Sequence, residues 1–210
     1  MKLLLIGATG LVGRHVLNMA LADQRVGEVI VLGRRALQVQ HPKLRELQVD
    51  FDDLPQDAET WRVDAVICAL GTTMRAAGSR QAFERVDRLY PLFAAQRARE
   101  HGVSAYVLNS AAGANPRSFF FYNRVKGKLE EELRELGFAS LSLVRPGLIG
   151  GERVDFRLGE RVAARLLTLL GPLLPRSWRI NPAPNIAKAL LEAAIEKPPG
   201  IHIVRSKQLA

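Results

Sequence analysis

The glycine-rich segment near the start of the chain constrains the fold more than any other feature. Gly7, Gly10 and Gly13 occur at spacings of three, directly after the apolar run 2–6 and at the start of the helix-like stretch 11–22. A sharp turn from strand to helix needs residues without a Cβ, and their absence lets the backbone approach a pyrophosphate. The N–H groups and dipole of the helix N-terminus stabilise the phosphate charge. We predict a dinucleotide-binding loop here; a purely structural turn is the alternative.

Short apolar segments alternate with helix-like segments along the chain. The expected strands are rich in Val, Ile and Leu, as in strands that are buried on both faces of a parallel sheet. They are residues 2–6, 28–32, 44–50, 65–69, 105–109 and 140–144. The helices expected between them are 11–22, 80–100 and 122–136, and Gly102 and Gly137 are placed to end the last two. This alternation predicts an α/β fold, a doubly wound parallel sheet of the NAD(P)-binding Rossmann type.

The C-terminal part of the chain has a different pattern. It contains two further helix-like stretches, 161–170 and 185–195, and a strand-like stretch, 200–204, with several prolines between them. A chain of 210 residues is of a size that suits one domain. We therefore interpret residues 1–210 as a single domain, and residues 147–185 as a small substrate-side cap within it.

Two arginines at the end of the second expected strand indicate which dinucleotide binds. An NAD-preferring site usually carries Asp or Glu about 20 residues beyond the glycine loop, where the acid holds the ribose 2′-hydroxyl. Arg34 and Arg35 occupy this region instead. A guanidinium donates bidentate hydrogen bonds that suit a 2′-phosphate. We predict NADP(H) as the cofactor, with Arg34 as the principal contact; the alternative is that the arginines are only solvated.

Other cofactor contacts are expected where strands end, because such sheets bind ligands outside their carboxyl edge. Asp50 and Phe51 stand at the end of the third strand, where they would bracket the adenine, and the glycine after the fourth strand allows close backbone approach. The full predicted cofactor set is Gly7, Thr9, Gly10, Leu11, Val12, Gly13, Arg34, Arg35, Asp50, Phe51, Leu70, Gly71, Thr72, Lys126 and Pro146.

Three residues form a candidate catalytic group. Tyr122 and Lys126 are four residues apart at the start of a predicted helix, so they share one helix face. An ammonium beside a tyrosine favours the phenolate, which makes the tyrosine a better acid and base near neutral pH. Ser110 follows the fifth strand, where its hydroxyl can donate a hydrogen bond to a substrate carbonyl oxygen. Each residue alone also fits a structural role, but together with the phosphate loop they favour catalysis.

These residues give the chain a resemblance to the short-chain dehydrogenase/reductases. The resemblance rests on the glycine loop 7–13, on Ser110, on Tyr122-x-x-x-Lys126 and on the segment 145–147. Segments 70–73, 86–87, 122–127 and 156–159 resemble an atypical subgroup that includes the eukaryotic Tat-interacting-protein oxidoreductase. The resemblance covers most of the chain.

The resemblance implies a mechanism for the matching residues. NADPH would deliver hydride to a carbonyl carbon, Tyr122 would donate the proton, Lys126 would hold the nicotinamide ribose, and Ser110 would orient the carbonyl. The segment around Pro146 would lie beside the nicotinamide. Many members also use an Asn in the helix after the fourth strand. Residues 80–100 contain none, so we expect no such relay; Asp87 lies in that region, with no role assigned.

The sequence leaves other functions open. A non-catalytic NADP(H)-binding regulatory or scaffold protein is the alternative to a reductase of a small carbonyl compound, because the short cap offers few polar groups. A sugar-nucleotide epimerase or dehydratase is a third hypothesis, against which the short C-terminal part argues. The aromatic run 119–121 fits either a substrate-pocket wall or core packing.

Charge and histidine pattern bear on partners. The net charge is +9 with a pI of about 10.3, but the basic residues are scattered, so we expect no nucleic-acid partner. The stretch 161–170 has a basic, leucine-rich pattern; packing on the sheet or in a homodimer fits it better than a membrane surface. The histidines lack metal-ligand spacing, so no metal is predicted.

The single cysteine bears on the compartment. Cys68 lies in an apolar run and no His or Lys flanks it, so we expect a buried, inert thiol. One cysteine cannot form an internal disulfide, which suits a reducing compartment. The apolar stretches are too short for a signal peptide or a membrane span. These features lead us to predict a cytoplasmic protein.

Overall fold

A seven-stranded parallel sheet forms the centre of the computed structural model, which describes residues 1–150 and 180–210. The strand order is β3-β2-β1-β4-β5-β6-β9, and all six neighbouring pairs are parallel. The strands are β1 (Lys2–Ile6), β2 (Glu28–Gly33), β3 (Leu44–Gln48), β4 (Ala65–Cys68), β5 (Ala105–Asn109), β6 (Ser140–Arg145) and β9 (Gly200–Arg205). The predicted doubly wound α/β fold is confirmed.

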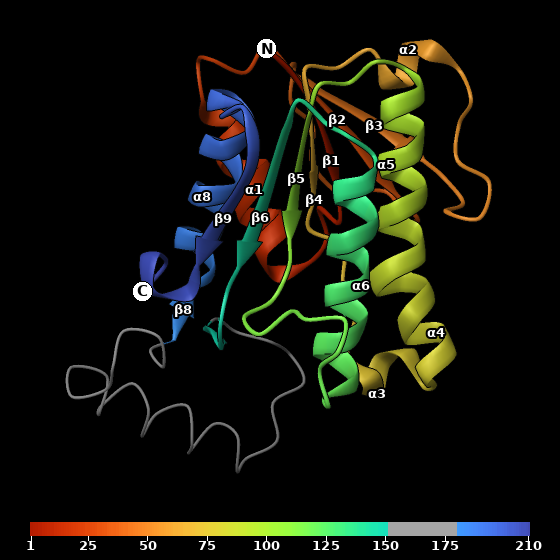
Figure 1. The fold of residues 1–210 in the computed structure, drawn as a ribbon. Helices are drawn as coiled ribbons and strands as arrows, with labels where there is room; N and C mark the ends of the chain where they lie inside the picture. The colour runs from red at the N-terminus through yellow and green to blue at the C-terminus, as the bar shows by residue number, and fades with distance from the viewer. Residues whose placement is uncertain (151–179) are drawn as a thin grey trace.

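Helices cover both faces of this sheet (Figure 1). Helices α1 (Leu11–Ala22) and α8 (Ala183–Glu196) pack on one face, and α5 (Tyr90–Glu100) and α6 (Phe121–Glu135) pack on the other. In β1, Leu3 and Leu5 belong to the first core cluster, whereas Leu4 and Ile6 belong to the second. All four are fully buried. Because both faces are covered, the central strands need apolar residues at every position, which explains their continuous apolar runs.

One predicted helix is interrupted. The expected helix 80–100 consists of α4 (Arg80–Glu84), a π-helical turn η1 (Arg85–Leu89) and α5. A single helix over this range is therefore wrong. The π-helical turn buries Asp87, which lies at its middle. Two short helices, α2 (Ala58–Trp61) and α3 (Met74–Ala77), and the 3-10 turn η4 (Ser206–Gln208) are too brief to show an apolar period, so the sequence did not predict them.

The segment before residue 151 contacts the segment after residue 179. Strand β7 (Ile149–Gly150) pairs with β8 (Asn181–Pro182). The Asn181 Oδ1 accepts hydrogen bonds from the Gly147 N–H at 2.7 Å and from the Ser206 hydroxyl at 2.9 Å. The predicted helix 161–170 and most of the predicted cap 147–185 lie outside the described residues, so both stay predictions. Within the described ranges, every helix is too short or too polar to cross a membrane.

Candidate cofactor and active site

The glycine loop connects β1 to α1 with no space for side chains. Gly7 has a φ of +89°, and a Cβ on it would lie 2.7 Å from the carbonyl carbon of Ala69 and from the nitrogen of Leu70. A Cβ on Gly13 would lie 2.0 Å from the Gly7 carbonyl oxygen. Both distances are shorter than any real Cβ contact. The loop, the first turn of α1 and the end of β4 therefore pack backbone against backbone, as the sequence predicted for these glycines.

The N-terminus of α1 has the features of an anion-binding site. Gly10 precedes the helix, and among the described residues no side chain caps it. The first α-helical backbone bond runs from the Arg14 N–H to the Gly10 carbonyl at 3.0 Å. The N–H groups of Leu11, Val12 and Gly13 precede it, where a helix leaves donors without intrahelical partners. Since the first turn contains no acidic residue, both the donors and the dipole favour a phosphate group here.

A shallow pocket beside this loop collects residues from four strand ends. Six of the predicted cofactor residues line it together with other residues of the same segments: Gly7, Thr9, Arg34, Arg35, Phe51 and Leu70. Asp50 is not among its lining residues; its Oδ1 accepts the Asp52 N–H at 2.9 Å. The ring of Phe51 is buried and stacks on Tyr90 at 5.4 Å. Glycines, an uncapped helix N-terminus, an aromatic wall and two exposed arginines in one place fit a dinucleotide.

The candidate catalytic helix α6 carries a stripe of polar residues beside the apolar face, Val125, Leu129 and Leu133, that it packs into the core. Tyr122, Lys126, Glu130 and Arg134 follow one another at intervals of four, which places them along one side. Both Lys126 and Glu130 are buried, at 2% and 0% exposure. Gly127 lets α6 approach the loop that follows β5, because a Cβ there would lie 2.1 Å from the Asn115 carbonyl carbon. The helix therefore contributes charged groups to the interior.

Lys126 forms a buried ion pair with Asp87. Its Nζ lies 2.9 Å from the Asp87 Oδ1, and the two side chains are 3% and 2% exposed. The Asp87 Oδ2 accepts the Thr72 N–H at 2.8 Å, and Gly71 passes so close that a Cβ there would lie 3.3 Å from Oδ1. Burial is the largest single influence and acts to lower the pKa of Lys126, but the charge and hydrogen bond of Asp87 together with the charges of Tyr122 and Cys68 outweigh it, and the net shift is upward. Lys126 is therefore charged at neutral pH.

Ser110 belongs to a second buried network, centred on Glu130. The Ser110 hydroxyl, in a residue 3% exposed, donates to Glu130 Oε1 at 2.6 Å. Arg145 donates from Nε to the same oxygen at 2.9 Å and from a second nitrogen to Oε2, and Arg134 lies 3.3 Å from Oε2. The hydroxyl proton thus points at a carboxylate, and the oxygen lone pairs remain as acceptors. The sequence prediction named neither Glu130 nor this use of Ser110.

The other predicted catalytic-side residues lie near the same sheet edge. Tyr122 is 42% exposed, and its ring meets Phe83 edge-on at 5.9 Å. Pro146 is buried, and its carbonyl accepts the Ala112 N–H at 2.7 Å, which joins the loop after β5 to the end of β6. Cys68 is fully buried, so the predicted burial is confirmed, and burial raises the pKa of its thiol.

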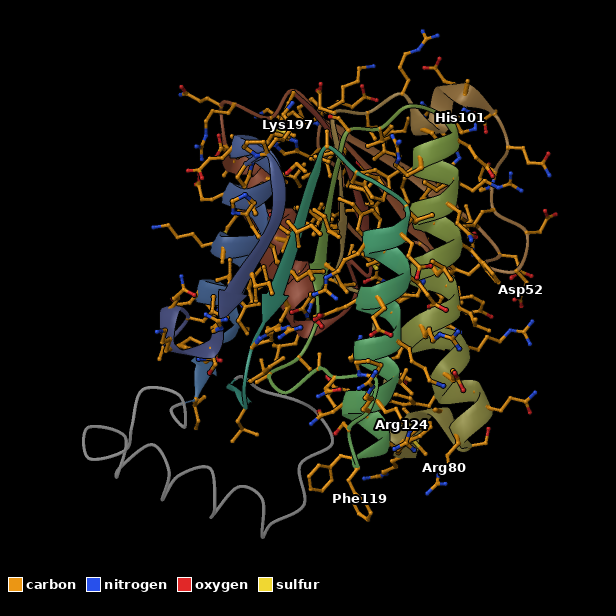
Figure 2. All side chains as sticks on the ribbon, viewed as in Figure 1. Asp52, Arg80, His101, Phe119, Arg124 and Lys197 are labelled. Carbon is orange, nitrogen blue, oxygen red and sulfur yellow. The ribbon has the colours of Figure 1, made fainter. Side chains whose placement is uncertain are left out.

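The aromatic run 119–121 is divided between solvent and packing. Phe119 and Phe120 are 94% and 70% exposed, and Figure 2 shows Phe119 at the lower end of the molecule, near the start of α6. Core packing is therefore wrong for these two residues. Phe121 lies beside Phe83 at 5.7 Å, and the Arg80 guanidinium lies 5.3 Å from its ring centre.

Comparison with known proteins identifies relatives over most of the chain. The model of a family described as NAD(P)H-binding matches residues 7–155. The protein fmp52, mitochondrial, of Aspergillus niger is 33% identical over 204 residues, which cover 91% of this chain and 86% of the relative. The rat protein HTATIP2 is 34% identical over 194 residues, with 89% and 78% covered. The predicted resemblance to the subgroup of the Tat-interacting-protein oxidoreductase is confirmed.

Solved structures share the fold at low sequence identity. MoeE5 in complex with UDP-glucose and NAD superposes with a TM-score of 0.75 at 18% identity, over 97% of this chain and 75% of that protein. The oxidoreductase ylbE of Lactococcus lactis superposes with a TM-score of 0.68 at 18% identity, over 100% of this chain and 94% of that one. These likenesses support the Rossmann-type fold.

The comparisons overturn one expectation. The names of the fungal relatives describe them as mitochondrial. The prediction of a cytoplasmic protein is therefore wrong. It rested on a single cysteine and on short apolar stretches, which suit any reducing compartment and do not distinguish one from another.

Proposed function

The chain belongs to the NAD(P)H-binding family, and from this premise we propose that it is an NADPH-dependent oxidoreductase that reduces a small carbonyl compound. The observation that carries the proposal is the buried, charged Lys126 one helical turn from the half-exposed Tyr122, at the sheet edge that also holds the glycine loop. When bound, NADPH supplies the hydride; the chain supplies the proton and the orientation.

Tyr122 is the proposed proton donor. Its exposure lets the phenol reach the oxygen of a substrate at the carboxyl edge. The phenolate that remains after proton donation is negatively charged, and the Lys126 ammonium stabilises that charge. Lys126 also has N–H groups to offer the ribose hydroxyls of the nicotinamide half. In the reverse direction the Tyr122 phenolate acts as the base, so the same two side chains serve both directions.

Ser110 takes a more restricted role than the sequence suggested. A hydroxyl that donates to Glu130 presents only lone pairs toward a ligand. We propose that Ser110 in this state accepts a hydrogen bond from the hydroxyl of the alcohol product. It can donate to a carbonyl oxygen only when its hydroxyl rotates away from Glu130.

NADP(H) is the proposed cofactor because of the residues that follow β2. Arg34 and Arg35 are exposed and line the pocket beside the glycine loop. The Gln48 side chain donates to the Arg34 carbonyl at 3.0 Å, which holds the backbone of this turn against β3. A 2′-phosphate on the adenine ribose would meet guanidinium groups here, whereas NAD(H) carries only a hydroxyl at that position.

Replacement of Arg34 by glutamate tests this cofactor choice. We expect Arg34→Glu to lower the ratio of NADPH affinity to NADH affinity by about 100-fold, because a charge-assisted bond to the phosphate is lost and a repulsive charge is introduced. Calorimetric titration with each cofactor measures the ratio. Arg62→Glu, an exposed site away from the pocket, makes the same change in net charge and should leave the ratio unaltered. An unchanged ratio in Arg34→Glu would remove the role assigned to this residue.

The oxidoreductase proposal is tested by carbonyl-dependent consumption of NADPH. Purified protein is mixed with NADPH and a series of small aldehydes and ketones, and the loss of reduced cofactor is followed by absorbance. We expect consumption that requires both the protein and a carbonyl compound. Folded protein that binds NADPH but oxidises it with none of them would instead support the second candidate.

The second candidate is a non-catalytic NADP(H)-binding regulatory protein. The engagement of Ser110 favours it, because the residue is nearly inaccessible and its proton is directed at Glu130. In such a protein, bound cofactor would control contacts with partners, and Tyr122 and Lys126 would only shape the site. Such a protein would bind NADPH without consuming it, so Tyr122→Phe would have no turnover to remove.

A further inference from the structure

Asp87 is a buried carboxylate to which the proposed reaction gives no role. It is 1% exposed, and a charge at such depth is destabilising unless it is paired and hydrogen-bonded. Both of its oxygens have partners, Lys126 on α6 and the N–H of Thr72 in the loop after β4. A single side chain therefore joins the candidate catalytic helix to a loop that the sequence predicted to contact the cofactor.

The backbone around Asp87 departs from regular helix. The π-helical turn η1 separates α4 from α5, and Asp87 lies at its centre. A π turn inserts a residue into a helix and rotates the residues beyond it relative to those before, and such turns are frequent at functional sites. The interruption coincides with the position at which the side chain meets Lys126.

The chemistry of the pair leaves Lys126 able to bind a ligand. An ammonium has three N–H donors. Asp87 accepts from one of them through Oδ1, while its other oxygen is engaged by Thr72. The remaining donors can serve neighbouring hydroxyls, such as those of a ribose. The carboxylate also offsets the effect of burial, which alone would favour a neutral amine.

We propose that Asp87 is a positioning residue that holds the Lys126 ammonium at the nicotinamide-ribose end of the cofactor site. The proposal rests on the proposed function, since it assumes that this edge binds NADP(H). It extends that function by naming the group that orients Lys126. Asp87 acts through Lys126 and itself touches neither cofactor nor substrate.

A second ion pair joins the same two elements and provides a matched control. Arg88, next to Asp87 in η1, donates from Nε to Glu132 Oε2 on α6 at 3.0 Å. The side chains of Arg88 and Glu132 are 23% and 27% exposed, and neither contacts Lys126 or Asp87 in the buried ion pair. Glu132→Gln therefore weakens the link between η1 and α6 without altering Lys126.

The test compares two ligands of different length. Asp87→Asn removes the charge but keeps the size of the side chain and an oxygen for the Thr72 N–H. NADPH reaches both halves of the site, whereas adenosine 2′,5′-bisphosphate lacks the nicotinamide ribose. We expect Asp87→Asn to weaken NADPH binding by about tenfold or more, since a charge-assisted bond is impaired, and to leave bisphosphate binding unchanged. Glu132→Gln should change neither affinity.

A double-mutant cycle ties the effect to Lys126. We expect Asp87→Asn to cause no further loss of NADPH affinity in a Lys126→Met background, because the group that Asp87 positions is absent there. Independent losses in the two variants would overturn the proposal. So would an equal loss for NADPH and the bisphosphate, which would make Asp87 a structural tether of the 70–73 loop, or no loss for either.

A conservative variant covers the case in which Asp87→Asn does not fold. Asp87→Glu keeps the charge and displaces the carboxylate by one methylene, so we expect a selective loss of NADPH affinity in the same direction. Wild-type affinity for NADPH in that folded variant would overturn the proposal. If wild-type protein binds NADPH no more tightly than the bisphosphate, the nicotinamide half adds no affinity, and this would contradict the positioning of Lys126. Wild-type protein that binds neither ligand would show that the proposed function itself has failed.

Discussion

Replacement of Tyr122 by phenylalanine is expected to lower kcat for NADPH-dependent carbonyl reduction by about 10²- to 10⁴-fold. The substitution removes one hydroxyl group, the proposed proton donor, and keeps the ring that packs edge-on against Phe83. Because Tyr122 is half-exposed and, in the proposed function, faces the substrate, neither folding nor cofactor binding should depend on that hydroxyl. We expect the dissociation constant of NADPH to stay within about twofold of wild type.

Tyr90→Phe is the matched control for this prediction. It deletes the same atom from a tyrosine whose hydroxyl donates to Asp52 Oδ2 at 3.1 Å and whose ring stacks on Phe51. Turnover should be nearly retained there. Undiminished turnover in Tyr122→Phe would mean that another group transfers the proton. A loss of NADPH binding that accounts for the whole loss of rate would show that Tyr122 has a binding role.

Replacement of Glu130 by alanine is expected to lower the free energy of unfolding by about 3–5 kcal/mol. Glu130 is fully buried and is the shared acceptor for Ser110, Arg145 and Arg134. Its removal leaves a partly buried guanidinium and a buried hydroxyl without their acceptor, which costs more than the net contribution of the bonds themselves. Urea unfolding measures the change.

Glu131→Ala is the corresponding control, since it is the exposed neighbour of Glu130 on the same helix. We expect it to change stability by less than about 0.5 kcal/mol. Equal stability of Glu130→Ala and Glu131→Ala would contradict the account of this network. Glu130→Gln, which keeps the size and one acceptor oxygen, should fall between wild type and Glu130→Ala.

The fold and the phosphate loop could be predicted because their signals are local. A strand buried on both faces must be apolar at successive positions, and Leu3, Leu4, Leu5 and Ile6 satisfy that requirement in adjacent residues. Gly7 and Gly13 are required by backbone contacts within a few residues of the turn and with the end of β4. The contacts within the turn are readable without knowledge of distant partners, whereas the contact of Gly7 with the end of β4 is not.

The buried charges could not be predicted, because their partners come from elsewhere in the chain. In the sequence alone, Glu130 and Lys126 resemble solvated helix residues. Only the fold places Ser110 and Arg145 against Glu130, and Asp87 of η1 against Lys126. The spacing of four that joins Tyr122 to Lys126 continues to Glu130 and would have been the available signal. The π-helical turn carries no pattern of its own, so an uninterrupted helix was expected over 80–100.

The most direct test of the account is calorimetric titration of the purified, folded protein with NADPH and, separately, with NADH. The glycine loop, the uncapped start of α1 and the arginines after β2 predict tight binding of NADPH and much weaker binding of NADH. Equal affinities would contradict the NADP(H) assignment. Binding of neither cofactor by folded protein would contradict the central claim that this chain is an NADPH-dependent oxidoreductase.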